Sequence, residues 1–109
     1  ELYRVPPFEW LFTILLRGYA DAGCMDKASE LLADLSPQFG LSMTRSMVYQ
    51  VVRGWTLAGR LDTALQVAES AADVNYEYVI AAVVKAFGRR GQLEEAEQQL
   101  LALCQRYRL

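Results

Sequence analysis

Three basic residues recur at one position of a repeating pattern, six residues before a glycine each time. They are Arg17, Arg53 and Lys85. A cation that recurs once per repeat along one surface is suited to neutralising the phosphates of a nucleic-acid backbone. The same spacing also fits ordinary solvated positions, because surface helices carry charged outer faces. The charges alone leave both interpretations open.

Other reactive chemistry is poorly represented. The chain contains no histidine, and Cys24 and Cys104 are far apart, which excludes the usual zinc spacings and argues against a disulfide framework. We therefore expect two reduced, partly buried thiols. The Gly-Arg-Arg-Gly stretch at residues 88–91 lacks the strand and the Lys-Ser/Thr pair of a phosphate loop. The sequence predicts no enzyme, metal, cofactor or small-molecule substrate.

An internal repeat builds the elements that position the three cations. Its glycines, Gly23, Gly59 and Gly91, are 36 and 32 residues apart, which is typical of an array of helical hairpins. Each glycine ends one helix in the left-handed conformation. The acid three residues later suits the first turn of the next helix, and the alanine five residues later allows close helix packing. Such a hairpin must stack on its neighbours to bury its apolar face.

We therefore predict an all-α fold, a solenoid of three helix-turn-helix hairpins within a single domain over residues 1–109. The hairpins span about residues 8–41, 42–73 and 74–107. The six helices are expected at about 8–22, 25–35, 44–58, 61–72, 76–90 and 92–107. Residues 36–40 should break the second helix, with Ser42 or Thr44 capping the third and Asp73 or Asn75 the fifth. Three hairpins are about the minimum for stability, so we expect a longer array.

Charge separates between the two kinds of helix. Counted over residues 8–22, 44–58 and 76–90, the first helices carry six basic and three acidic residues. Counted with their flanking residues over 24–39, 60–73 and 92–108, the second helices carry four basic and nine acidic residues. The net charge of −2 therefore conceals a basic and an acidic face. The longest apolar run, residues 10–16, is too short to span a bilayer, so we expect no membrane insertion. No targeting segment is visible.

The turns carry a family resemblance. Residues 18–23 and 54–65 closely resemble the pentatricopeptide repeat, and residues 86–96 follow the same order. The tetratricopeptide repeat is the second choice, because it has a small residue where this chain has bulky apolar ones: Leu16, Val52 and Val84. The resemblance covers about residues 8–107. It implies a right-handed solenoid whose first helices line a concave groove that holds single-stranded RNA in a mitochondrion or chloroplast.

The resemblance also implies where bases would be read, namely ten residues before each glycine together with the last residue of the repeat. These positions are Thr13 with Thr44 or a near neighbour, Tyr49 with Asn75 or Tyr76, and Ala81 with no visible partner. Only Thr13 is a typical base-reading residue, and Tyr49 suits either stacking on a base or packing. The candidate RNA-binding residues are Thr13, Arg17, Thr44, Tyr49, Arg53, Tyr76, Ala81, Lys85 and Arg89.

Two functional hypotheses follow. The first is an RNA-binding helical-repeat protein of organellar RNA metabolism or translation, which grips the backbone of single-stranded RNA along its concave face. The alternative is a protein-binding scaffold subunit of a large organellar assembly such as a mitochondrial ribosome. The alternative is motivated by the acidic total charge, the poor match at base-reading positions and the apolar ends expected of a short array.

Overall fold

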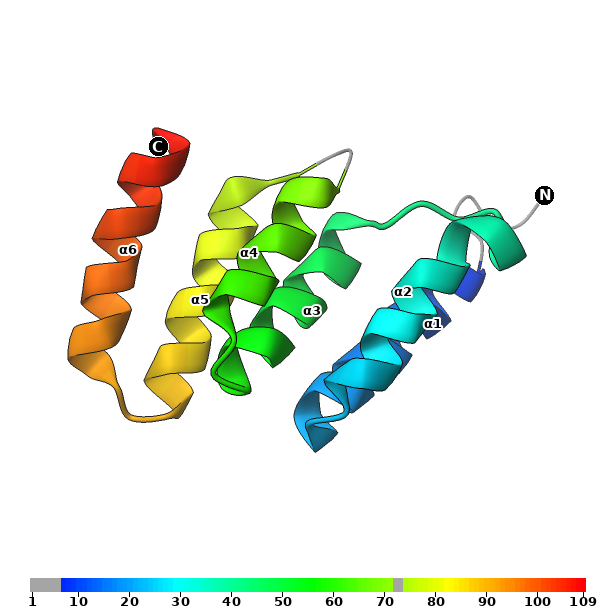
Figure 1. Cartoon of the computed structure of the whole chain (residues 1–109), viewed down its shortest axis with the longest axis horizontal. Helices are drawn as coiled ribbons and strands as arrows, with labels where there is room; N and C mark the ends of the chain where they lie inside the picture. Colours follow the sequence, from blue (N-terminus) through cyan, green and yellow to red (C-terminus); the bar gives the residue numbers. More distant parts are fainter. Residues whose placement is uncertain (1–6, 72–73) are drawn as a thin grey trace.

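A computed structural model describes residues 7–71 and 74–109 of the chain. The described residues form six helices and no strand: α1 (Pro7–Ala22), α2 (Met25–Phe39), α3 (Arg45–Leu57), α4 (Leu61–Ser70), α5 (Tyr76–Arg89) and α6 (Leu93–Tyr107). Consecutive helices pair into three hairpins that stand in a row, with the C-terminus at the end opposite α1 (Figure 1). This arrangement confirms the predicted all-α helical-repeat fold.

The three turns between paired helices share one geometry. Gly23, Gly59 and Gly91 have φ values of 76°, 83° and 74°, a region that side chains with a Cβ disfavour. The residue after each glycine donates its N–H back to a carbonyl five residues earlier, at 2.8 to 2.9 Å. These bonds satisfy carbonyls at the end of the first helix. The repeated glycine therefore fixes where each hairpin reverses direction.

The second helix extends further than predicted. An end at Leu35 was wrong, because α2 continues through Pro37 to Phe39. Pro37 lacks its own backbone donor, but the Leu41 N–H donates to the Leu35 carbonyl at 3.0 Å and closes the last turn. Gly40, at φ 66°, ends the helix and donates its N–H to the Ser36 carbonyl at 3.0 Å. Residues 36–39, which were expected to break the helix, thus form its last turn.

Two side chains set the starts of later first helices. The Thr44 hydroxyl accepts the Met47 N–H at 3.1 Å at the start of α3. The Asn75 side chain accepts the Tyr78 N–H at 3.1 Å at the start of α5. These bonds satisfy backbone donors that have no partner within the helix. Of the two predicted caps of the third helix, Thr44 rather than Ser42 is therefore the one observed. Asp73, the other candidate cap of the fifth helix, lies outside the described residues.

The core lies between the helices, with α3 at its centre. Met47 and Val51 on α3 belong to a cluster with the first hairpin, and Val48 and Val52 belong to a cluster with α4 and the third hairpin. The alanines five residues after each turn glycine are all buried, as their small size predicted: Ala28, Ala64 and Ala96. First helices α1, α3 and α5 therefore pack side by side and place their faces on one continuous surface.

Two further sequence expectations concern single features. Both cysteines are free thiols, but Cys24 is exposed rather than partly buried because it directly follows the turn glycine. Cys104 is partly buried, as expected. None of the described helices combines the length and apolar character needed to cross a membrane.

Candidate nucleic-acid interface

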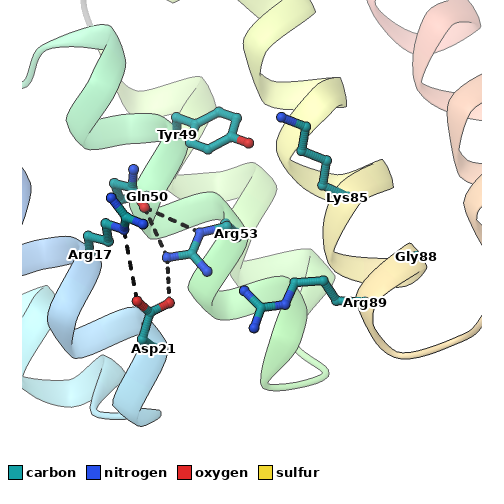
Figure 2. Close-up of a pocket in the computed structure, with 8 residues that line it drawn as sticks. All are labelled: Arg17, Asp21, Tyr49, Gln50, Arg53, Lys85, Gly88 and Arg89. Carbon is teal, nitrogen blue, oxygen red and sulfur yellow. Dashed lines mark hydrogen bonds and ion pairs between the residues drawn. The ribbon is translucent and has the colours of Figure 1, made fainter.

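A groove of about 530 Å³ opens across the three first helices. Figure 2 shows side chains from α1, α3 and α5 pointing toward one another around it. The described residues that line it are Arg17, Asp21, Tyr49, Gln50, Arg53, Lys85, Gly88 and Arg89. The structure thus brings together five of the nine predicted candidates, from three separate hairpins.

The groove is strongly cationic. Four of its described lining residues are basic and only Asp21 is acidic. Arg17 has 69 % of its side chain exposed, and Lys85 and Arg89 are exposed as well. Their positive charges can therefore meet a ligand from solvent. A cleft lined mainly by one sign of charge raises the local concentration of a ligand of opposite charge.

Arg53 differs from the other cations, although the sequence places it at an equivalent position. It is only 7 % exposed. Its guanidinium donates to Gln50 Oε1 at 3.2 and 3.0 Å, and one of these nitrogens lies 2.9 Å from Asp21 Oδ1 (Figure 2). Arg17 lies 4.0 Å from the same carboxylate. Arg53 therefore lies in the floor of the groove as a fixed charge that joins α3 to α1.

Tyr49 and Lys85 form the wall between two hollows. The Lys85 ammonium lies 5.8 Å from the centre of the Tyr49 ring, within cation–π range. A second hollow of about 250 Å³ continues past them and is lined by Ser46, Tyr49, Gln50, Tyr78, Ala81 and Lys85. Tyr78 is half exposed and adds a second aromatic ring to this region. The candidate Ala81 contributes to the second hollow rather than to the first.

Five residues that line the two hollows escaped the sequence prediction: Asp21, Ser46, Gln50, Tyr78 and Gly88. Three of them had a local signal. Tyr78 stands three residues before Ala81, and Gln50 three residues before Arg53, so each shares a helix face with a predicted residue. Asp21 stands four residues after Arg17. The same helical spacing that aligned the cations would have found all three.

The family model of the PPR (pentatricopeptide) repeat matches residues 10–35. Residues 10–35 are therefore similar to a pentatricopeptide repeat. The match covers most of α1 and the part of α2 up to its buried Leu35. It confirms the predicted family on the first hairpin. No curated protein and no solved structure matches the chain.

Three residues at predicted base-contacting positions of the pentatricopeptide pattern lie outside both hollows. The Thr13 hydroxyl donates to the Glu9 carbonyl at 3.0 Å. Thr44 is occupied as the α3 cap. The Tyr76 ring stacks on Tyr107, with centroids 4.0 Å apart. Each of these three side chains thus has an intramolecular contact, whereas the other six candidates line at least one of the two hollows.

A second polar cluster ties the later repeats together on α4 and α6. Glu69 Oε2 accepts from Arg106 at 3.0 and 2.8 Å and from the Tyr107 hydroxyl at 2.8 Å. The Tyr107 hydrogen bond, followed by the bonds from Arg106, holds the pKa of the Glu69 carboxyl below its usual value. None of these residues lines the groove. Within the described ranges, no group of acidic residues and cysteines is arranged to hold a metal ion.

Proposed function

We propose that this pentatricopeptide repeat chain binds single-stranded RNA along the groove formed by α1, α3 and α5, chiefly through phosphates. One observation carries the proposal: four basic side chains surround a single groove in a chain whose net charge is −2. A polyanion gains affinity by releasing counterions where such charges gather.

The surroundings of the four basic residues indicate different roles in RNA binding. Arg53 is held by Asp21 and Gln50, so it contributes a fixed positive potential. Arg17, Lys85 and Arg89 are exposed and can move to meet successive phosphates. This division favours an interaction that follows the backbone rather than one that selects a sequence.

The aromatic residues offer a site for unpaired bases. Tyr49 and Tyr78 both line the second hollow, next to the phosphate-binding cations. Aromatic faces stack on any base, and this stacking requires single-stranded nucleic acid. We therefore do not expect a purely double-stranded ligand, because its paired bases could not stack on the tyrosines of the second hollow.

The proposal extends to RNA metabolism or translation in a mitochondrion or chloroplast. The matched repeat supports it, because pentatricopeptide repeats are typical of organellar proteins. A fluorescent fusion of the full-length protein, imaged with an organelle marker, tests this part separately. A diffuse cytosolic signal would reject the organellar setting without affecting the groove.

The groove itself is tested by fluorescence anisotropy with a labelled single-stranded oligouridine at low salt, followed by a salt titration. Three exposed cations predict a logarithmic slope of roughly −2, at about −0.7 per phosphate contacted on a single strand. We expect Lys85→Glu to weaken binding by about tenfold and to flatten the slope. Lys27→Glu is the matched control, since Lys27 is an equally charged, exposed residue on α2. Absence of binding at low salt, or equal losses in both variants, would reject the proposal.

A protein-binding scaffold, in an organellar assembly such as a mitochondrial ribosome, is supported by a different observation. Large apolar side chains are exposed on the two end hairpins, among them Leu11 and Leu15 on α1 and Leu101 on α6. None of them lines the cationic groove. The two functions are therefore separable, because charged substitutions at the leucines should remove a protein partner and leave RNA affinity unchanged.

A further inference from the structure

The Gln50 side chain lies between the cationic groove and the second hollow, and it lines both of them. Its oxygen is fully engaged, because Oε1 accepts two N–H groups of the Arg53 guanidinium, at 3.2 and 3.0 Å (Figure 2). A carbonyl oxygen has two lone pairs, so these two bonds use its capacity to accept. An arginine can only donate, so Arg53 also fixes which end of the Gln50 amide is the oxygen.

Arg53 is itself held in place before any ligand arrives. Its side chain is buried, and its guanidinium lies 2.9 Å from Asp21 Oδ1 on the neighbouring helix α1. The amide nitrogen of Gln50, which carries two donors, points away from Arg53. Because Arg53 lines only the groove and Gln50 lines both spaces, this nitrogen lies on the side of the second hollow.

The polar side chains around the second hollow are chiefly donors. The exposed Lys85 ammonium has three N–H groups and no acceptor. The hydroxyls of Ser46, Tyr49 and Tyr78 can either donate or accept, so they do not discriminate. None of the described residues that line this hollow is acidic. A ligand therefore meets donors from Gln50 and Lys85, and no side chain there that can only accept.

The four bases differ in the group that such donors would meet. Uracil and guanine carry a carbonyl oxygen on the edge where cytosine and adenine carry an amino group. A carbonyl oxygen can accept from the Gln50 amide or the Lys85 ammonium. An amino group would instead place donor against donor and leave N–H groups without a partner, which costs binding free energy.

We propose that the second hollow prefers uracil and guanine over cytosine and adenine, and that Gln50 is the residue that determines this preference. Arg53 is a positioning residue, because it acts by orienting the Gln50 amide. The preference rests on the proposed RNA-binding function and concerns the same site. It applies to the nucleotide in the second hollow, within a strand that is otherwise held by its phosphates.

The test compares labelled oligouridine and oligocytidine of equal length by fluorescence anisotropy, at neutral pH and one low salt concentration. Both strands have the same number of phosphates and rings of the same size, so the ratio of their dissociation constants reports on the base. We expect the unmodified chain to bind oligouridine about fivefold more tightly, as one hydrogen bond would provide. Gln50→Glu keeps the shape of the side chain and an oxygen for Arg53, but it replaces the amide donor by an acceptor. The variant should therefore lose the preference for oligouridine or reverse it.

Arg17→Ala is the charge-matched control, because it changes the net charge by the same amount as Gln50→Glu. Arg17 lines the groove but not the second hollow. This control should weaken the binding of both strands by the same factor and leave the ratio unchanged.

A measurement on the ligand side needs no substitution in the protein. A strand of pyrimidin-2-one nucleotides carries neither a carbonyl nor an amino group at the position that distinguishes uracil from cytosine. The unmodified chain should bind it more weakly than oligouridine and more tightly than oligocytidine.

The preference and the RNA-binding function fail in different ways. Equal affinity of the unmodified chain for oligouridine and oligocytidine would overturn the preference and leave the RNA-binding function intact. Absence of binding to both strands would reject that function, and the preference with it. A full preference retained by a folded Gln50→Glu variant would show that Gln50 does not select the base. A pyrimidin-2-one strand that binds as tightly as oligouridine would show that the carbonyl makes no contact.

Discussion

The two junctions between hairpins place equivalent residues in different roles. Between the first and second hairpins, Arg53 is buried and binds Asp21 across the junction at 2.9 Å. Between the second and third hairpins, the equivalent cation is Lys85, which remains exposed and lies over the Tyr49 ring. One cation closes a junction, and the other remains accessible to a ligand.

The difference originates two residues before the turn glycine. The first hairpin has Asp21 there, and the second has Leu57. Arg53 therefore meets a carboxylate on the preceding first helix, whereas the helix that precedes Lys85 has the apolar Leu57 at the corresponding position and offers no carboxylate there. The third hairpin has Arg89 at this position, which adds a further cation to the groove. A repeat thus determines where a side chain lies, but the neighbouring repeat determines what that side chain does.

The largest expected effect comes from removing the buried cation. Arg53→Ala should lower the free energy of unfolding by about 2 kcal/mol, because Gln50 and Asp21 lose their partner and a packed side chain is lost. Arg17→Ala, at the same repeat position, should lower it by less than about 0.5 kcal/mol, since that side chain is exposed. Urea denaturation of both variants measures the difference. Equal losses would show that the buried ion pair of Arg53 adds nothing to stability beyond what the exposed Arg17 contributes.

The same pair separates stability from binding. Under the proposed function, Arg17→Ala should weaken RNA binding in a salt-dependent manner while leaving the fold stable. If a folded Arg17→Ala chain had unchanged RNA affinity, Arg17 would not contribute to RNA binding.

Alanine substitutions at two equivalent glycines, Gly54 and Gly18, should have smaller effects on stability, and these two effects should be opposite in sign. Gly54→Ala should destabilise the chain by roughly 1 kcal/mol, because a Cβ there would lie 2.5 Å from the Met25 sulfur and 2.9 Å from the Ala20 Cβ. Overpacking of about 1 to 3 kcal/mol outweighs the gain in helix propensity of about 1 kcal/mol. Gly18→Ala meets no neighbour and should stabilise by roughly 0.5 to 1 kcal/mol.

Thermal unfolding of the two glycine variants at low protein concentration compares them directly. A drop in melting temperature for Gly54→Ala and a rise for Gly18→Ala are expected. Destabilisation by both substitutions would mean that the surroundings of Gly18 are not open. Stabilisation by both would mean that Met25 can move aside at little cost.

Local features of the fold were predictable from the sequence. The turn glycines, the buried alanines and the face shared by Arg17, Arg53 and Lys85 all depend on residues within one hairpin or on helical spacing. The end of α2 was missed because Pro37 suggested a break, whereas the following Gly40 supplied a better helix end. Proline weakens a helix locally, and its final position depends on the bonds that the next residues form.

The roles of individual candidates were less predictable because their partners are distant in sequence. Arg53 is held in an ion pair by Asp21 from the preceding hairpin, and Tyr76 stacks on Tyr107 from the next helix. The repeat pattern assigns both to a binding surface, since it describes one hairpin at a time. Contacts between hairpins decide which of the candidates remain available to a ligand.

The smallest expected effect concerns the polar cluster that joins the second and third hairpins. Because bonds from Tyr107 and Arg106 lower the pKa of Glu69 in the folded chain, the carboxylate stabilises the fold above its unfolded pKa, near 4.5. That contribution is lost as pH falls through the lowered folded pKa.

Glu69→Gln should therefore reduce the melting temperature at pH 7 by on the order of 2 °C, as expected for an exposed pair. The gap from the unmodified chain should close as the pH approaches 2, whereas Glu30→Gln, at an exposed acid of α2, should show little change at either pH. A gap that stays constant from pH 7 to pH 2 would mean that the stabilisation by Glu69 does not depend on its charge. The second junction would then be held without electrostatics, in contrast to the ion pair that joins the first.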